Sequence, residues 1–150
     1  MSVEDYSKQV DKAFFIPQRA SFCGRDNVSE NIIIVGDYRI CEGKFEKLQA
    51  AMAELAELVK AKEPQILAYN AYLNENVMQL IVLQVHPDSA SAEFHMEVTG
   101  SAFPKELINL SLIDIYGKPS QSLLDKLRLS ETTGSTGVFV HEHSSGFSRF

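Results

Sequence analysis

Apolar and polar residues follow regular patterns from residue 31 onward, and these patterns predict alternating strands and helices. An apolar, β-branched run from Ile32 to Val35 continues to Ile40 and is typical of a strand. Residues 44–62 carry apolar side chains at spacings of three and four, which predicts a helix that Pro64 ends. The other side of this helix is charged, so we expect only one side to face a core.

The following segment predicts a β-hairpin and a second helix. Residues 65–73 and 77–86 are apolar segments, and the Asn-Glu-Asn sequence between them is typical of a turn. Asp88 or Ser89 can cap a helix that runs to about Val98. The residues expected to carry that helix are Ala92, Phe94, His95, Met96 and Val98.

Residues 110–116 read as one more strand, which completes the order strand, helix, strand, strand, helix, strand. This order predicts an α+β fold of the ferredoxin-like βαββαβ type, with an antiparallel sheet and both helices on one face. We expect a single domain over the 150 residues. Within it, residues 1–30 form an N-terminal arm, 31–117 the ferredoxin-like core, and 118–150 a C-terminal helix-strand extension.

The C-terminal extension predicts a helix over 122–129 and a strand over 138–143. His141 and His143 would share one face of that strand, a spacing that can supply two ligands to a metal ion. A third ligand has to come from elsewhere, and exposed histidines are common near a chain end. The two cysteines, Cys23 and Cys41, do not have the spacing of metal ligands. We therefore expect no metal site.

The strands are apolar on both faces of the predicted sheet. Ile32 and Ile34 alternate with Ile33 and Val35, and residues 80–83 are apolar throughout. Two helices cover only one face, and a sheet with a solvated face shows polar residues at alternate positions. We expect the second face to pack against a second copy, which gives a homodimer through the sheet face. The alternative is that the arm and the extension cover this face within one chain.

Charge and composition exclude several classes of partner. Lys and Arg number 14 against 20 Asp and Glu, and the net charge of −6 argues against nucleic acid, whose binding depends on neutralised phosphates. The longest apolar runs are far shorter than the ~20 residues that span a bilayer, and the N-terminal residues lack the pattern of a secretory signal. We expect a cytoplasmic protein that binds neither nucleic acid nor a membrane.

Three segments carry a resemblance to a known family. They are IIIVGDYRICEGKFEKLQ from residue 32, KEPQILAYNAYLN from residue 62, and LIVLQVHPDSASAEFH from residue 80. Over residues 32–116 the sequence resembles the antibiotic biosynthesis monooxygenase family. The resemblance implies ferredoxin-like subunits that pair into a dimeric α+β barrel. It also implies a pocket between helices and sheet in which an oxidisable small molecule reacts with oxygen, without a metal or a bound cofactor.

The same resemblance suggests the candidate site residues. His95 is similar to the histidine that many members carry on this helix, and a neutral imidazole can accept a proton near neutral pH. Tyr69 resembles a family tyrosine whose hydroxyl would orient a phenolic or quinone-like substrate. We take both as candidate catalytic residues. The candidate substrate-binding residues are Tyr38, Tyr72, Gln84, His86 and Met96. The alternative for His95 is a core histidine bonded to a backbone carbonyl, and for the tyrosines it is plain packing.

Departures from the family pattern narrow the expected activity. Many relatives have Glu and an aromatic residue where Gln84 and His86 stand. Haem-degrading members have Asn, Trp and His where this sequence has Gly36, His95 and Lys105, so we expect no haem degradation. We expect a cofactor-independent monooxygenase for a small aromatic, quinol or polyketide-like substrate. The alternative is a non-catalytic small-molecule-binding or stress-related dimeric protein of the same fold. A regulatory amino-acid-binding domain also shares this strand order.

Overall fold

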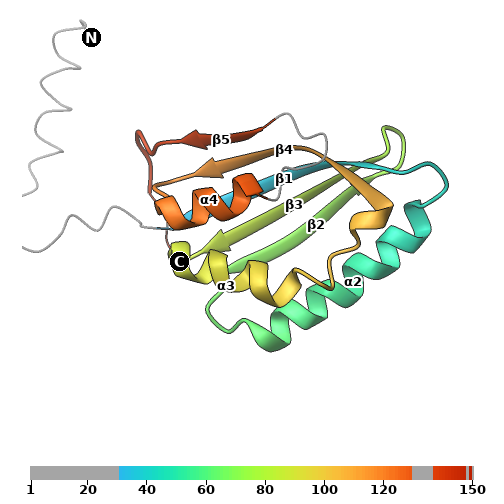
Figure 1. Ribbon diagram of the computed structural model, residues 1–150, viewed down its shortest axis with the longest axis horizontal. Coiled ribbons are helices and arrows are strands. Elements are labelled where there is room, and N and C mark those ends of the chain that lie inside the picture. Colours follow the sequence, from blue (N-terminus) through green and yellow to red (C-terminus); the bar gives the residue numbers. More distant parts are fainter. Residues whose placement is uncertain (1–30, 130–136, 148, 150) are drawn as a thin grey trace, which may run out of the picture.

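The computed structural model describes residues 31–129, 137–147 and 149, which contain five strands and three α-helices. The expected arm over 1–30 lies outside the described residues. The elements, in chain order, are β1 (Ile32–Ile40), α2 (Phe45–Lys62), β2 (Ala68–Asn74), β3 (Gln79–His86), α3 (Ser89–Thr99), the 3₁₀ turn η1 (Lys105–Leu107), β4 (Ile108–Tyr116), α4 (Gln121–Leu129) and β5 (Val138–His141) (Figure 1).

The strands form one sheet in the order β2-β3-β1-β4-β5. The first four strands are antiparallel to their neighbours, which confirms the ferredoxin-like βαββαβ core. The fifth strand pairs parallel to β4, so the sheet is mixed rather than purely antiparallel. A parallel neighbour needs a crossover connection, and α4 provides it between β4 and β5. The C-terminal extension therefore widens the sheet and adds a third helix to it.

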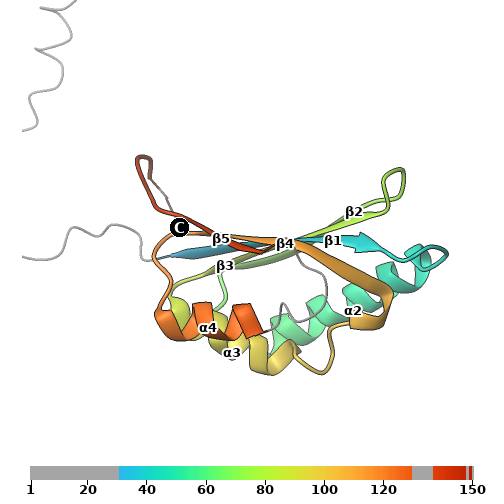
Figure 2. The ribbon, with the colours of Figure 1, turned by 45° about the horizontal axis from the view of Figure 1, so that its top comes forward.

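All three helices cover the same face of the sheet (Figure 2). The buried residues of α2 are Leu48, Met52, Leu55 and Val59, which confirms the spacing of three and four. In α3 the buried residues are Ala92, His95 and Thr99, so His95 faces the sheet. Phe94 was expected in this core, but its side chain is 42% exposed because it lies one position, and about 100°, from His95 around the helix.

The opposite face of the sheet is not covered by any described element (Figure 2). Several of its central residues are nevertheless apolar and only half-buried, as the alternation in the sequence predicts, although Asp37 also lies on this face and accepts hydrogen bonds from Gln79. The apolar residues are Ile33, Val35, Ile81, Leu83 and Leu112. Three large aromatic side chains lie on the same face and are 41–56% exposed, namely Tyr72, Tyr116 and Phe139. What covers this face stays a prediction.

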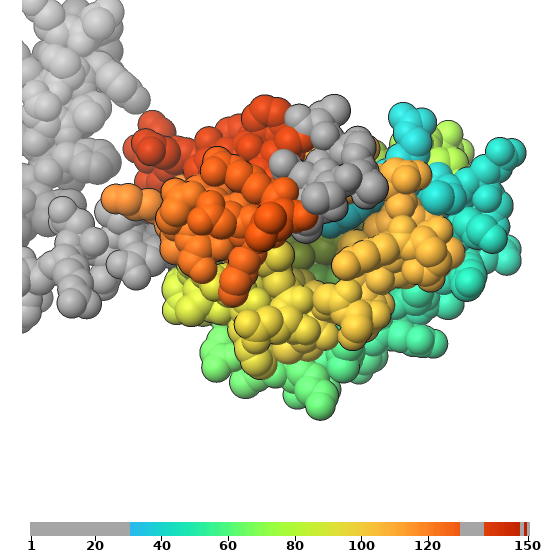
Figure 3. Space-filling model, in the orientation of Figure 1, coloured from blue at the N-terminus to red at the C-terminus, as the bar shows by residue number. Residues whose placement is uncertain are grey.

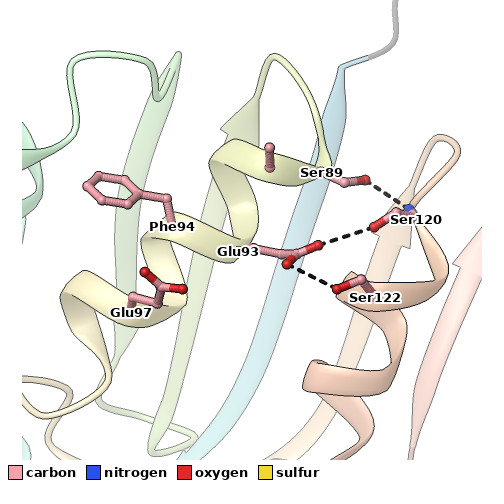
Figure 4. Close-up of a pocket in the computed structure, with 7 residues that line it drawn as sticks. Ser89, Glu93, Phe94, Glu97, Ser120 and Ser122 are labelled. Atoms are coloured by element: carbon pink, nitrogen blue, oxygen red, sulfur yellow. Dashed lines mark hydrogen bonds between the residues drawn. The ribbon is translucent and has the colours of Figure 1, made fainter.

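The helices α3 and α4 are joined through Glu93 (Figure 4). Its carboxylate accepts hydrogen bonds from the hydroxyls of Ser120 at 3.3 Å and Ser122 at 3.1 Å, and from Lys126 Nζ at 2.7 Å. The Lys126 bond lowers the pKa of Glu93 below its usual range. The Ser120 amide donates to Ser89 Oγ at 2.9 Å. A shallow surface pocket lies over these contacts. The Glu93 carboxylate in this pocket already accepts hydrogen bonds from Ser120, Ser122 and Lys126, so we assign Glu93 a structural role.

None of the helices in the described part of the chain is both long and apolar enough to cross a bilayer.

Candidate functional site

A cavity of about 350 Å³ lies between the sheet and the helices α3 and α4. On the helix-covered face the surface is hollowed between α3, the η1 segment and α4 (Figure 3). The apolar lining residues are Ile34, Met96, Phe103, Ile108, Leu110, Ile113 and Leu127. The polar lining residues are Tyr38, Gln84, His95, Thr99, Lys105 and Asn109. This volume falls within the ~300–1,000 Å³ of typical ligand pockets.

Gly36 determines where the Tyr38 side chain lies. A Cβ atom at position 36 would be 2.6 Å from Tyr38 Cε2 and 2.7 Å from the Tyr38 hydroxyl oxygen. The phenol ring therefore lies back over the middle of β1, where only a glycine leaves room for it. Its other face contacts Phe103, with ring centroids 5.4 Å apart. Burial raises the pKa of Tyr38 to about 12, so its hydroxyl stays protonated and can donate into the cavity.

A buried carboxylate-histidine pair lies beside the cavity, and its histidine is part of the cavity wall. His95 Nδ1 lies 2.9 Å from both carboxylate oxygens of Glu63, and both side chains are almost completely buried. Glu63 is the residue after α2, and its amide still donates to Val59 O at 2.9 Å. Pro64 follows at once and prevents another helical turn. This helix end holds the Glu63 side chain against α3.

His95 is set up to accept a proton from a ligand in the cavity. Burial lowers the pKa of His95, and the Glu63 carboxylate opposes this effect without cancelling it. The imidazole is thus neutral at pH 7 and donates its Nδ1–H to Glu63, which leaves a lone pair on Nε2. Among the residues that the structure describes, Nε2 has no hydrogen-bond partner. Once protonated, the ring would be stabilised by the Glu63 carboxylate.

Tyr69 contacts His95 but does not line the cavity. The two rings lie with centroids 5.3 Å apart at 44°. The Tyr69 hydroxyl is buried without a hydrogen-bond partner in the described part of the chain. Burial raises the pKa of Tyr69, and the neighbouring Tyr38 and Glu63 add to the effect. In this arrangement Tyr69 restrains the imidazole ring, and a ligand would have to displace other groups to reach its hydroxyl.

His86 is completely buried on the far side of His95. The two imidazole rings meet edge to face at 5.5 Å. His86 Nδ1 lies 3.0 Å from Ser91 Oγ, and Nε2 lies 3.1 Å from Gln84 Oε1. Burial, followed by the neighbouring His95, lowers the pKa of His86 to about 4. Gln84 and His86 share one face of β3 because they are two positions apart, but only Gln84 lines the cavity.

Four of the seven candidate residues come together at the cavity, namely Tyr38, Gln84, His95 and Met96. Tyr69 and His86 do not line the cavity, and each packs against the His95 ring. Tyr72 does not belong to this group, because it is three positions from Tyr69 on the same strand and so points to the opposite face, where it is 56% exposed. The candidate set also lacked Glu63, whose only signal in the sequence is a glutamate at a helix end.

The two C-terminal histidines do not share a strand. The last strand ends at His141, so His143 lies beyond it and the expected strand over 138–143 is too long. His141 Nε2 instead bonds Asp114 at 2.8 Å, and its ring stacks on Tyr116 at 4.8 Å. No group of three His, Cys, Asp or Glu side chains suited to a metal ion occurs within the described ranges.

Comparison with solved structures supports this architecture. MupZ from Pseudomonas fluorescens is similar with a TM-score of 0.62 and 23% identity, over 84% of this chain and 94% of that one. The chain has a ferredoxin-like fold. A conserved protein from Methanosarcina mazei Go1 matches with a TM-score of 0.52 and 20% identity, over 61% of this chain and 95% of that one. At these identities the matches show a shared fold and nothing about activity.

Proteins named for the expected family are also among the structural matches. One from Caulobacter crescentus, whose name provisionally places it among antibiotic biosynthesis monooxygenases, has 19% identity and a TM-score of 0.48, over 58% of this chain and 88% of that one. No protein-family model and no curated protein matches the sequence. The site geometry therefore has to carry any assignment of function.

Proposed function

We propose that this protein is a cofactor-independent monooxygenase that acts on a small aromatic, quinol or polyketide-like substrate bound between sheet and helices. The observation that carries the proposal is the Glu63–His95 pair in the wall of a largely apolar cavity. Burying a carboxylate costs stability unless it is well paired, and such groups are concentrated at functional sites. The pair supplies a positioned base, which is needed to form the electron-rich anion that reacts with oxygen.

The chemistry starts with a proton transfer to His95. Its Nε2 would take a proton from an acidic O–H or C–H bond of the substrate, while Glu63 stabilises the imidazolium that forms. The resulting electron-rich anion reacts with oxygen. For a ring methylene the balance is R₂CH₂ + O₂ → R₂C=O + H₂O. Two C–H bonds break, one C=O bond forms, the second oxygen atom leaves as water, and the substrate supplies all the electrons.

The rest of the cavity would hold the substrate and exclude water. Its apolar residues surround a flat, apolar ring system, and Met96 can adapt its unbranched side chain to the ring edge. Tyr38 offers a hydroxyl donor to a substrate oxygen. A water-poor cavity strengthens these polar contacts and limits side reactions of the anion.

Oxygen consumption with a panel of quinols, anthrones and phenolic polyketides tests the proposal. We expect turnover with at least one of them, and a loss of about 100-fold or more in His95→Asn, in line with the removal of a general base. The double variant Glu63→Gln/His95→Asn avoids leaving a buried carboxylate unpaired, so it should fold and still lack turnover. His141→Gln, outside the cavity, is the matched control and should retain activity.

A non-catalytic binding protein is the second candidate. It is favoured by the fact that the Glu63–His95 contact also ties the end of α2 to α3 and could have a purely structural role. Saturable binding of the panel without oxygen consumption in the wild type, or turnover that His95→Asn leaves unchanged, would favour this candidate over the monooxygenase.

A second copy of the chain is the proposed partner of the uncovered sheet face. The support is the run of half-buried apolar residues across β1, β3 and β4 together with three exposed aromatic side chains. Light scattering at micromolar concentration should give twice the monomer mass. Leu83→Lys, in the centre of this face, should give a monomer, whereas Gln49→Lys on the exposed side of α2 should not. A monomeric wild type would instead favour cover from within one chain.

A further inference from the structure

Three polar side chains form a hydrogen-bonded chain that ends at the cavity. Ser91 Oγ lies 3.0 Å from His86 Nδ1, and His86 Nε2 lies 3.1 Å from Gln84 Oε1. Ser91 is in the first turn of α3, where its amide donates to Oδ1 of the capping residue Asp88 at 2.8 Å. His86 is completely buried, whereas Gln84 lines the cavity. The first two members therefore act on a ligand only through the third.

The contacts give this chain a direction. Because the oxygen of the Gln84 amide faces His86 Nε2, that nitrogen carries the hydrogen and donates it. His86 Nδ1 is then the acceptor and receives the Ser91 hydroxyl. A neutral imidazole is required for this pattern, and the lowered pKa of His86 is consistent with it. The amide NH₂ of Gln84 points away from His86 and has no partner among the described residues.

The cavity lining has the charge pattern of a site for an anionic oxygen. Among the described residues no Asp or Glu lines the cavity, and Glu63 lies behind the His95 ring rather than in the lining. Lys105 is the charged residue of the lining, and it is exposed at the η1 turn. Donors aimed at a position where negative charge develops stabilise that charge more than mobile groups do.

We propose that the Gln84 amide NH₂ binds the anionic oxygen of a phenol or enol substrate, and that His86 and Ser91 are positioning residues that keep this end of the amide turned to the cavity. An unrestrained amide could equally present its oxygen, which would repel the anion. The proposal rests on the proposed function of the same cavity and adds the substrate class, namely compounds with an acidic hydroxyl on a conjugated ring or enol.

The probe 4-nitrophenol tests the binding role, since its phenol and phenolate forms absorb at different wavelengths. Its pKa when bound is read from absorbance as a function of pH. We expect this value to be about one unit lower in the wild type than in Gln84→Met, because the anion loses a hydrogen bond in the variant. Gln49→Met, on the exposed side of α2 and away from the cavity, is the matched control and should match the wild type. His95 is present in all three proteins, so its effect cancels.

The positioning role has its own variants. Ser91→Ala removes the donor that holds His86 in one tautomer, so the bound probe should shift part of the way toward its pKa in Gln84→Met. Ser91→Thr keeps a hydroxyl and should restore the wild-type value. Gln84→Glu places a carboxylate next to the probe and should raise its pKa above that in Gln84→Met.

Specific outcomes overturn the inference. Equal probe pKa values in the wild type and Gln84→Met, or no saturable spectral change at millimolar 4-nitrophenol, would refute the role of Gln84. A Ser91→Ala protein that behaves as wild type would refute the positioning role. These binding results are independent of turnover: oxygen consumption can be absent while Gln84→Met still shifts the probe, which would reject only the monooxygenase.

Discussion

Acid should destabilise this protein through His86. The side chain is completely buried against His95, and both of its ring nitrogens are used by Ser91 and Gln84. Burial lowers its pKa from 6.5 to about 4. In the unfolded chain the ring is solvated and regains its ordinary pKa. Between these two values the unfolded state therefore binds a proton that the folded state does not.

The sign and size of the effect follow from this difference. Stability rises with pH wherever the unfolded state binds more protons, so here it is lost as the pH falls from 6.5 toward 4. For a single group with these two pKa values, moving from pH 7 to pH 5 lowers the free energy of unfolding by about 2 kcal/mol. The loss levels off below pH 4 at about 3 kcal/mol.

Urea unfolding at pH 7, 6 and 5, followed by circular dichroism, measures this loss. The comparison is between the wild type and His86→Gln, which cannot titrate in this range. His95 also has a lowered pKa and remains in both proteins, so the difference between their slopes reports His86 together with its coupling to His95.

Parallel stability curves for the wild type and His86→Gln would refute this reasoning. So would a wild type that becomes more stable as the pH falls from 7 to 5, because the sign would then be wrong. Either result would mean that burial does not keep His86 neutral over this pH range. A charged ring donates from both nitrogens, so Nε2 would still donate to Gln84 and Ser91 would have to accept from Nδ1.

Three further predictions concern the other site residues. Tyr69→Phe removes a buried hydroxyl that has no hydrogen-bond partner among the described residues. It should raise the free energy of unfolding by about 1 kcal/mol, measured by urea unfolding, and a clear loss would contradict this. Gly36→Ala should displace the Tyr38 ring and weaken 4-nitrophenol binding about tenfold or more, and equal affinity would contradict the close approach. Glu63→Gln should lower the pKa of His95 further, because the carboxylate that stabilises the charged ring is gone. NMR titration of His95 measures this shift, and a higher pKa in the variant would contradict the prediction.

Local patterns in the sequence predicted the order of elements, and the family resemblance suggested the candidate residues that line the cavity. The period of two along β1 and β3 placed Tyr38 and Gln84 on faces that share the cavity, because strand geometry fixes the side on which each residue lies. The same period separates Tyr69 from Tyr72, so the position of Tyr72 on the opposite face was also available from the sequence. His95 faced the core because of its place among the buried positions of α3.

Only the tertiary structure decided which of these faces meet. Glu63 and His95 are 32 positions apart, and neither belongs to a shared motif; they pair because α2 ends where α3 packs beside it. The parallel pairing of β5 with β4 likewise depends on how α4 crosses the sheet. Backbone periodicity is a local property that a sequence displays directly. Contacts between elements depend on how their faces pack, and no single segment carries that information.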